Sequence, residues 1–426
     1  MTALRWRAIR PGTPGSDRHP QASLVSLVAM LLAFESSLYS AVTPVLPHYA
    51  HTLDASKPAL GLLSAAYPAG LIPGALLGGW IASRVGVRRT TMAGLIFFGI
   101  AVAGFGFASS LVALDALRAA QGLFCGLIWG GGLTWVIAAS PAERRGATIG
   151  TAIAAATFGT LIGPLIGTAA VALGTRPVFC ALGIVAFALA ARTRRYPAPP
   201  RTANADTARP PLRDVVRTPG LPLGTWLITL EAMTIGATNV LLPLRLSHFG
   251  ASGVAIGATF LAAAALSSVL SPIVGRVSDR RGARLLLVTG LTASAILVST
   301  LVLPRTAAVL APLSVIALGG PLAAYMIPSV SMMTVSAEAT GVALVVVTTL
   351  GNLAYAVGET IGAPVAAGLS QATSDAVPLL VLTALMLATL WPVSRIRGTR
   401  PGAHLEPEPR QPSTGSSVTS RATSAA

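Results

Sequence analysis

The chain has 426 residues, of which 53% are hydrophobic and only 10% are charged, and its mean hydropathy is +0.72. A soluble domain carries about 25% charged residues, so this composition excludes an ordinary water-soluble protein. The net charge of +16 does not indicate nucleic-acid binding, because, apart from Arg5-Trp6-Arg7, aromatic side chains do not alternate with the basic ones as they do in nucleic-acid readers.

Long apolar runs are the dominant pattern along the chain. A helix needs about 20 predominantly apolar residues to cross the hydrocarbon core, and inside lipid a helix satisfies its own backbone hydrogen bonds. The strands of a membrane barrel would instead alternate in polarity over about 10 residues, a pattern that this sequence does not show. We therefore expect an all-α membrane protein with twelve transmembrane helices. The expected spans lie near residues 23–47, 58–82, 90–109, 111–139, 146–173, 176–193, 221–245, 252–275, 284–303, 307–335, 341–369 and 376–394.

Polar segments divide these spans into two sets of six. Residues 194–220 are rich in Arg, Pro and Ala and predict a cytoplasmic linker, and residues 397–426 predict a disordered cytoplasmic tail. With residues 1–22 in the cytoplasm as well, most of the 30 Lys and Arg residues fall on that side, as the positive-inside rule requires. This distribution predicts a multi-pass protein of the plasma (inner) membrane with both termini in the cytoplasm.

The two sets of spans repeat the same landmarks. A constant offset of 196 residues relates five pairs, and an offset of 199 relates two glycines of the fifth expected span to two of the eleventh. Such self-similarity indicates duplicated halves, which predicts one six-helix bundle over 23–193 and a second, pseudo-symmetric bundle over 221–396. In secondary transporters built this way, substrate binds near the midplane between the halves. The pairs are Glu35 with Glu231, Pro47 with Pro243, Gly79 with Gly275, Gly86 with Gly282, Arg88 with Arg284, Gly159 with Gly358 and Gly163 with Gly362.

Two loops carry the same pattern of glycines and arginines. The first, GGWIASRVGVRR from Gly78 to Arg89, resembles the loop between the second and third helices of the major facilitator superfamily, and GRVSDRRGAR from Gly275 to Arg284 is its copy. The resemblance implies the fold of that family and a gating role for these loops on the cytoplasmic side. Ser83 stands where the family usually has an acid, which the second loop keeps as Asp279; loops that only set topology by their charge are the alternative. The gating candidates here are Ser83, Arg84, Gly86, Arg88, Asp279, Arg280, Gly282 and Arg284.

The fifth expected span carries a spaced glycine series with a Gly-Pro step. Gly159, Gly163 and Gly167 recur every four residues and predict a smooth ridge for close helix packing, and Pro164 predicts a bend. The series resembles the signature of the drug:proton antiporter branch of the same superfamily, as does the sequence PVLP at residues 44–47. The resemblance favours export over uptake and adds these three glycines and the proline to the gating candidates. Ordinary membrane packing is the alternative.

Three glutamates lie inside expected spans of a chain with only 14 acidic residues. Glu35 and Glu231 fall near mid-span, where a charge is most costly, and burial favours the protonated form of a carboxyl group. Glu35, Glu231 and Glu359 are therefore the candidates for a coupling proton, with a hydrogen-bonded interhelical tie as the alternative for each. Arg118, which with Gln121 resembles the family's Arg-x-x-Gln-Gly element, joins them as a residue that would help an acid release its proton. A structural arginine that reaches the membrane surface is the alternative for Arg118.

In the family fold, the first, fourth, seventh and tenth helices line a central cavity. The resemblance therefore implies that Glu35 and Glu231 face each other across this cavity. Aromatic and sulfur-containing side chains would form an apolar pocket there, although packing against lipid is equally expected for each of them. The candidate substrate-binding residues are Glu35, Tyr39, Gln121, Trp129, Glu231, Asn239, Tyr325 and Met326.

The sequence and the resemblance together predict a secondary active transporter. We expect proton-coupled efflux of a small amphipathic or cationic compound, such as a drug or a secondary metabolite, by alternating access in a protein that functions as a monomer. Its partners would be the small-molecule substrate, protons and the lipid bilayer. The sequence shows no phosphate-binding loop and no metal-ligand pattern, so we expect no enzyme activity, cofactor or metal. The alternatives are efflux of a sugar or another polar metabolite, and a transport-inactive sensor or scaffold, which should have lost its membrane acids.

Overall fold

The computed structural model is all-helical in the residues that it describes, which are 18–140, 145–197, 218, 220–340, 342 and 344–395. The first half contains α1 (Arg18–Ser40), η1 (Thr43–Val45), α2 (Leu46–Thr52), α3 (Lys57–Val85), α4 (Val87–Phe107), α5 (Leu111–Ala138), α6 (Arg145–Leu173) and α7 (Thr175–Thr193). The second half contains α9 (Leu221–His248), α10 (Gly253–Arg281), α11 (Ala283–Thr300), α12 (Ala307–Gly319), α13 (Pro321–Thr340), α14 (Leu344–Ala372) and α15 (Ala376–Ser394). Most of the expected segments 1–22 and 194–220, and all of 397–426, lie outside the described residues.

Eleven helical segments in the described part of the chain are long and apolar enough to cross a membrane. The remaining expected span corresponds to α14, which has 29 residues but carries the polar side chains of Asn352 and Glu359 in its middle. Glu359 is only 5% exposed, whereas Asn352 is exposed. The helix thus has the length of a span, and one of its two mid-helix polar side chains, Glu359, is buried in the protein.

Two of the expected spans are interrupted. The first ends as an α-helix at Ser40, passes through the 3-10 turn η1 and resumes as α2, because Pro44 and Pro47 lack the N–H groups that a continuous helix needs. The tenth is divided at Gly320 between α12 and α13, where Pro321 follows. Each interrupted segment is still a single candidate span, Ser23–Thr52 and Ala307–Thr340, as expected.

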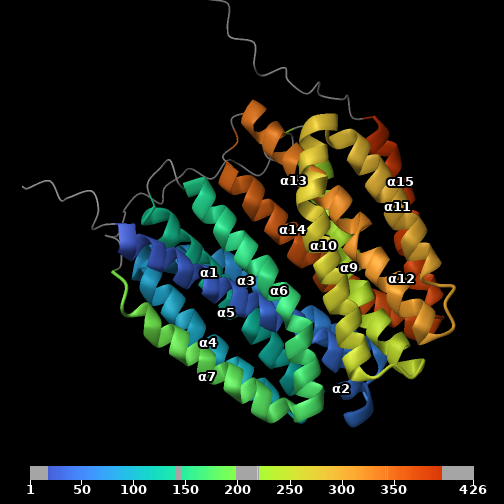
Figure 1. The fold of residues 1–426 in the computed structure, drawn as a ribbon, viewed down its shortest axis with the longest axis horizontal. Helices are drawn as coiled ribbons and strands as arrows, with labels where there is room; N and C mark the ends of the chain where they lie inside the picture. Colours follow the sequence, from blue (N-terminus) through green and yellow to red (C-terminus); the bar gives the residue numbers. More distant parts are fainter. Residues whose placement is uncertain are drawn as a thin grey trace, which may run out of the picture.

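The helices form two bundles that repeat each other. Figure 1 shows the first half, coloured blue to green, on one side of the molecule and the second half, yellow to red, on the other. A Cβ added to Gly163 of α6 would lie 2.5 Å from the Ser37 carbonyl oxygen of α1, and one added to Gly362 of α14 would collide with the Met233 carbonyl of α9. The same pair of spans is therefore packed through equivalent glycines in each bundle.

The bundles meet towards one end, which we call the distal end: α3, α10 and α15 begin there, opposite to the end where α1 begins and α15 finishes. A Cβ added to Gly61 of α3 would lie 2.7 Å from the Ala367 Cβ of α14. Gly257 of α10 packs in the same way against Thr168 of α6. The hydrophobic core of the first bundle also takes in Ala363 and Ala367 of the second. These contacts close the distal end over the centre of the molecule.

Candidate functional site

Glu35 on α1 is buried and receives hydrogen bonds from two other helices. Its side chain is 3% exposed. The Tyr67 hydroxyl of α3 donates to Oε1, and the Trp129 indole N–H of α5 donates to Oε2 at 2.8 Å. The neighbouring Ser36 hydroxyl lies 3.3 Å from Oε2. Side chains of three helices therefore fix this carboxyl group inside the first bundle.

Interlocking glycines bring α3 and α5 close enough for Tyr67 and Trp129 to share one carboxyl group. A Cβ added to Gly70 of α3 would collide with the Ala119 carbonyl of α5, and one added to Gly122 of α5 would collide with the Tyr67 carbonyl. Backbones can approach this closely only where the side chain is a hydrogen atom. The position of Tyr67 over Glu35 thus depends on glycine contacts between α3 and α5, and neither of these helices carries the acid.

Arg118 on α5 is 2% exposed, so its side chain is surrounded by protein. Its Nη1 donates to the Leu38 carbonyl at 3.3 Å and to Gln121 Oε1 at 2.9 Å, and its Nη2 donates to the Tyr39 carbonyl at 3.2 Å. The two carbonyls belong to the last turn of α1, where the helix end leaves acceptors free, and a cation is favourable at that end of the helix dipole. The guanidinium also lies 4.6 Å from the centre of the Tyr67 ring, and the hydroxyl of the same tyrosine donates to Glu35.

Gln121 links the same cluster to α4. Its amide donates to the Ala101 carbonyl at 3.2 Å while its oxygen accepts from Arg118. Both ends of the amide are therefore occupied, and the side chain is 2% exposed. This geometry makes Gln121 a support for Arg118, while its amide keeps a second N–H and its oxygen a second lone pair; its role as a substrate-binding residue stays a prediction.

Tyr39 connects the two bundles. Its hydroxyl, on α1, donates to Glu359 Oε1 on α14, and its ring centre lies 5.3 Å from that of Tyr67. A continuous series of contacts therefore runs from Glu35 through Tyr67 and Tyr39 to Glu359. We call these four residues the acid-tyrosine chain. The sequence analysis did not name Tyr67 among its candidate site residues.

Glu231 on α9 is 4% exposed, and its Oε2 has no hydrogen-bond partner among the described residues. The buried Tyr325 hydroxyl of α13 is likewise unpaired in the described structure. Glu231 lies within electrostatic range of both Glu359 and Tyr325. Asn239 of α9 and Met326 of α13 are half-buried. The second bundle thus contributes an acid and a phenol with unused hydrogen-bonding capacity.

The two loops that carry the gating candidates, residues 78–89 and 275–284, make equivalent contacts. Arg88 Nη1 donates to the Tyr196 carbonyl just beyond α7 at 3.2 Å, and Arg284 Nη2 donates to the Ser394 carbonyl at the end of α15 at 2.7 Å. Each loop turns on a glycine of positive φ, 98° at Gly86 and 84° at Gly282, a conformation that other residues adopt only with strain. The arginines therefore anchor each loop to the sixth span of its own bundle.

The other gating candidates of the loops lie at the surface. The exposed Ser83 hydroxyl donates to the Trp80 carbonyl at 2.8 Å, and the Arg84 guanidinium lies 4.0 Å from the centre of the Trp80 ring. Arg280 is exposed. The side chain of Asp279 lies outside the described residues, so its role as the retained acid stays a prediction.

The glycine series of α6 packs against α1. A Cβ added to Gly159 would collide with the Ala33 carbonyl, and one added to Gly167 would collide with the Ala41 carbonyl. Pro164 lies inside α6, and its carbonyl accepts from the Thr168 hydroxyl at 2.8 Å. The series therefore holds α6 on the helix that carries Glu35.

Asp115 is an acid that sequence reasoning missed. It lies in α5, within the span expected at 111–139, and its Oδ1 is buried with no hydrogen-bond partner among the described residues. The position of this acid inside an apolar run was sufficient to identify it as a candidate from the sequence. Tyr67 gave no such signal, because only the packing of α3 against α5 directs it to Glu35.

The family model described as Major Facilitator Superfamily matches residues 25–359 and 228–420 of the chain. The chain is 31% identical over 169 residues to the MFS-type transporter ppzB of Metarhizium rileyi (strain RCEF 4871), covering 38% of this chain and 33% of that protein. It is 29% identical over 255 residues to the chloramphenicol resistance protein of Streptomyces lividans, covering 58% and 64%. Both matches span less than two thirds of the relative's own length.

A solved structure has the same fold. It is a bacterial homologue of the human lysosomal transporter Spinster in an inward-facing and unoccupied conformation, with a TM-score of 0.70 and 15% sequence identity. The match covers 90% of this chain and 96% of that one, so the similarity extends over both bundles.

Proposed function

The chain belongs to the Major Facilitator Superfamily of membrane transporters, and on that premise we propose that it exports a small amphipathic or cationic compound in exchange for protons. Export proceeds by alternating access across the plasma membrane, with both termini in the cytoplasm and the monomer as the working unit. The family consists of transporters rather than enzymes. The relative named as a chloramphenicol resistance protein supports a drug-like substrate.

The acid-tyrosine chain is the observation that carries this proposal. Glu35 and Glu359 belong to different bundles, and Tyr39 spans the boundary between them by donating to Glu359. When the bundles move relative to each other, this bond must break, so the hydrogen bonding of a buried acid changes with the conformation. A group with two such environments binds a proton more tightly in one of them, which couples proton binding to the movement.

Exchange requires only that substrate and proton compete. A carboxylate such as that of Glu35 binds either a proton or the cationic group of a substrate, and each ligand then lowers the affinity for the other. Arg118 assists release of the proton by placing a positive charge beside Tyr67. Glu231 and Tyr325 offer the unused polar atoms of the second bundle to the same substrate.

Proton release on substrate binding tests the proposal. The purified protein in weakly buffered detergent is mixed with ethidium as a cationic probe or chloramphenicol as a neutral one, and the released protons are measured with a pH dye. We expect ethidium to release protons from the wild type, Glu35→Gln to abolish the release, and the exposed-acid control Asp54→Asn to leave it unchanged.

Variants of Glu231 and Glu359 show whether another glutamate carries the proton. If Glu231→Gln or Glu359→Gln alone abolishes the release while Glu35→Gln does not, the coupling site lies in the second bundle. Normal release by all three variants would refute these glutamates as proton carriers. Accumulation of the probes in everted vesicles without any dependence on a pH gradient would refute proton coupling.

A further inference from the structure

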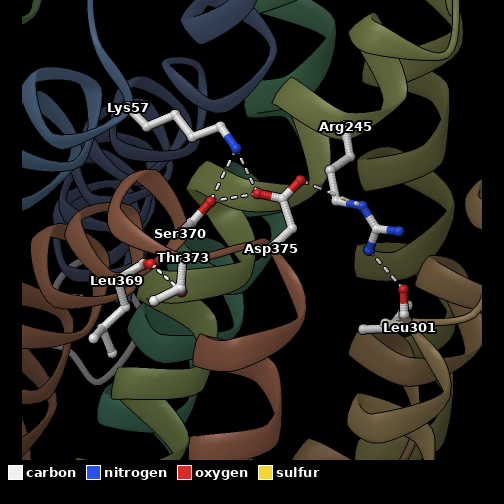
Figure 2. Close-up of polar contacts among 7 residues, drawn as sticks. All are labelled: Lys57, Arg245, Leu301, Leu369, Ser370, Thr373 and Asp375. Carbon is white, nitrogen blue, oxygen red and sulfur yellow. Dashed lines mark hydrogen bonds and ion pairs between the residues drawn. The ribbon is translucent and has the colours of Figure 1, made fainter.

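A polar cluster joins the two bundles at the distal end, away from the acid-tyrosine chain. Figure 2 shows Lys57, the first residue of α3, reaching Ser370 and Asp375 of the second bundle. Lys57 Nζ lies 2.5 Å from Asp375 Oδ1 and donates to Ser370 Oγ at 2.9 Å. The Ser370 hydroxyl in turn donates to Asp375 Oδ1. Three groups are thus mutually bonded across the boundary between the bundles.

Arg245 holds the carboxylate from the side of the second bundle. Its Nε lies 3.7 Å from Asp375 Oδ2, while its Nη1 and Nη2 donate to the carbonyls of Leu301 at 2.6 Å and Pro304 at 3.1 Å. Both carbonyls follow α11, so the guanidinium is fixed to its own bundle; Figure 2 shows the bond to Leu301. Asp375 therefore keeps a cationic neighbour whether or not Lys57 is present.

Lys57 and Asp375 both depart from the usual preferences of residues at a helix N-terminus. Lys57 is the only lysine in the sequence and stands at the start of a helix, where the helix dipole disfavours a cation. Asp375 stands at the N-cap of α15, where an aspartate normally accepts from the helix backbone, yet its side chain makes no cap hydrogen bond. Departures from local preference mark functional contacts, and here both side chains are turned towards each other.

We propose that Lys57, Ser370 and Asp375 form a latch that stabilises the state closed at the distal end, with Arg245 as the residue that positions the carboxylate. The latch rests on the alternating access of the proposed function, but it is independent of the substrate and of the proton site. Opening the distal end separates α3 from α14 and so carries Lys57 away from Asp375. After separation, Lys57 is hydrated and Asp375 keeps Arg245, so neither charge is left buried and alone.

The exposure of the pair sets the size of the effect. The side chains of Lys57 and Asp375 are 34% and 27% exposed, and solvent weakens such ion pairs. We therefore expect loss of the latch to change the ratio of closed to open molecules by about two- to fivefold. An effect of this size sets the populations of two states without trapping either one.

Distances between spin labels on the two bundles test the latch directly. Val112 at the start of α5 is 79% exposed and Leu303 after α11 is 72% exposed, and both lie at the distal end. Each is replaced by a labelled cysteine after substitution of the native Cys125 and Cys180. In membrane-mimetic nanodiscs without substrate, we expect Lys57→Met and Asp375→Asn each to shift the distance distribution towards longer values.

A second label pair distinguishes rocking of the bundles from local loosening. Arg89 and Leu285 lie near the other ends of α4 and α11 and are both exposed. If the latch controls alternating access, their distance shortens in the same variants in which the distal distance lengthens. The nearby Asp54→Asn, which removes an exposed negative charge from the loop before Lys57, should change neither distance.

Non-additivity is the decisive result. The double variant Lys57→Met/Asp375→Asn should match either single variant, because both substitutions remove the same contact. Acetylation of Lys57, the only lysine side chain available to the reagent, should lengthen the distal distance of the wild type and leave that of Asp375→Asn unchanged. The proposal is overturned if the single variants keep the wild-type distribution or if their effects add. Because no substrate is present, either result is independent of whether Glu35 carries the proton.

Discussion

A buried arginine without a carboxylate partner is costly inside a membrane, and Arg118 lowers this cost by using the break in α1. The Leu38 and Tyr39 carbonyls at the end of α1 and the Gln121 side chain accept its hydrogen bonds. The same arginine thereby fixes the turn that precedes η1 and the orientation of Tyr67 above Glu35. Its structural role and the role proposed for it in proton release therefore rest on one set of contacts.

Arg118→Lys tests this arrangement at constant charge. An ammonium group cannot reproduce the planar fork of a guanidinium, so at least one of the three acceptors is left unpaired. We expect a loss of about 1.5–3 kcal/mol, the range for a hydrogen bond to a charged group, measured by thermal unfolding in detergent. The control Arg176→Lys, at an exposed position of α7, should cost less than about 0.5 kcal/mol. Equal losses in both variants would contradict the capping role.

At the scale of the helices, glycines decide which elements lie close together. Gly163 faces Ser37 and Ser40 of α1, and a Cβ at this position would collide with the Ser40 hydroxyl. Gly150 lies on the same helix, and a Cβ there would meet no atom within 4 Å. A substitution at Gly150 therefore reports only the helix propensity of glycine, whereas one at Gly163 also reports the packing of α6 against α1.

Gly163→Ala and Gly150→Ala should consequently have opposite effects on stability. Overpacking costs about 1–3 kcal/mol, so Gly163→Ala should lower the unfolding temperature and the transport rate by pushing α6 away from α1. Gly150→Ala should raise stability by up to about 1 kcal/mol, because alanine favours a helix over glycine. Thermal unfolding and vesicle transport measured side by side would show this contrast. A neutral Gly163→Ala would mean that the ridge has room to adjust.

The apolar runs and the duplicated landmarks were sufficient to predict the bundles, because the bilayer imposes span length and the repeat imposes equivalent packing. The matched glycine contacts at Gly163 and Gly362 correspond to the offset read in the sequence. The partners of Glu35 could not be predicted in the same way, since Tyr67 and Trp129 reach it only through the approach of α3 to α5. That Glu35 faces Glu231 stays a prediction; the hydrogen bond that joins a buried glutamate to the other bundle is the one from Tyr39 to Glu359.

For the whole molecule, orientation in the membrane determines which side the distal contacts close. The bias of Lys and Arg residues predicts that the distal end faces away from the cytoplasm. A reporter fused after Ala426 should be active only in its cytoplasmic form, and one inserted at exposed Asp54 only in its external form. The reverse pattern would place the latch on the cytoplasmic side and would contradict the predicted orientation of the protein in the membrane.

The stability of the closed molecule should depend on pH through Asp375. Burial raises the pKa of this carboxyl group, but hydrogen bonds from Lys57 and Ser370 and the charges of Lys57 and Arg245 outweigh burial and hold the pKa below its ordinary value of 3.8. A lowered pKa means that the contribution to stability is complete above the ordinary value and is lost as the pH falls through the lowered one. We therefore expect the difference in unfolding temperature between wild type and Asp375→Asn to be constant from about pH 5 to 8. The difference should shrink below about pH 4 and vanish once the carboxylate is protonated. A difference that already disappears near neutral pH would show that protons operate the latch under physiological conditions, whereas a constant one leaves proton coupling to the buried glutamates.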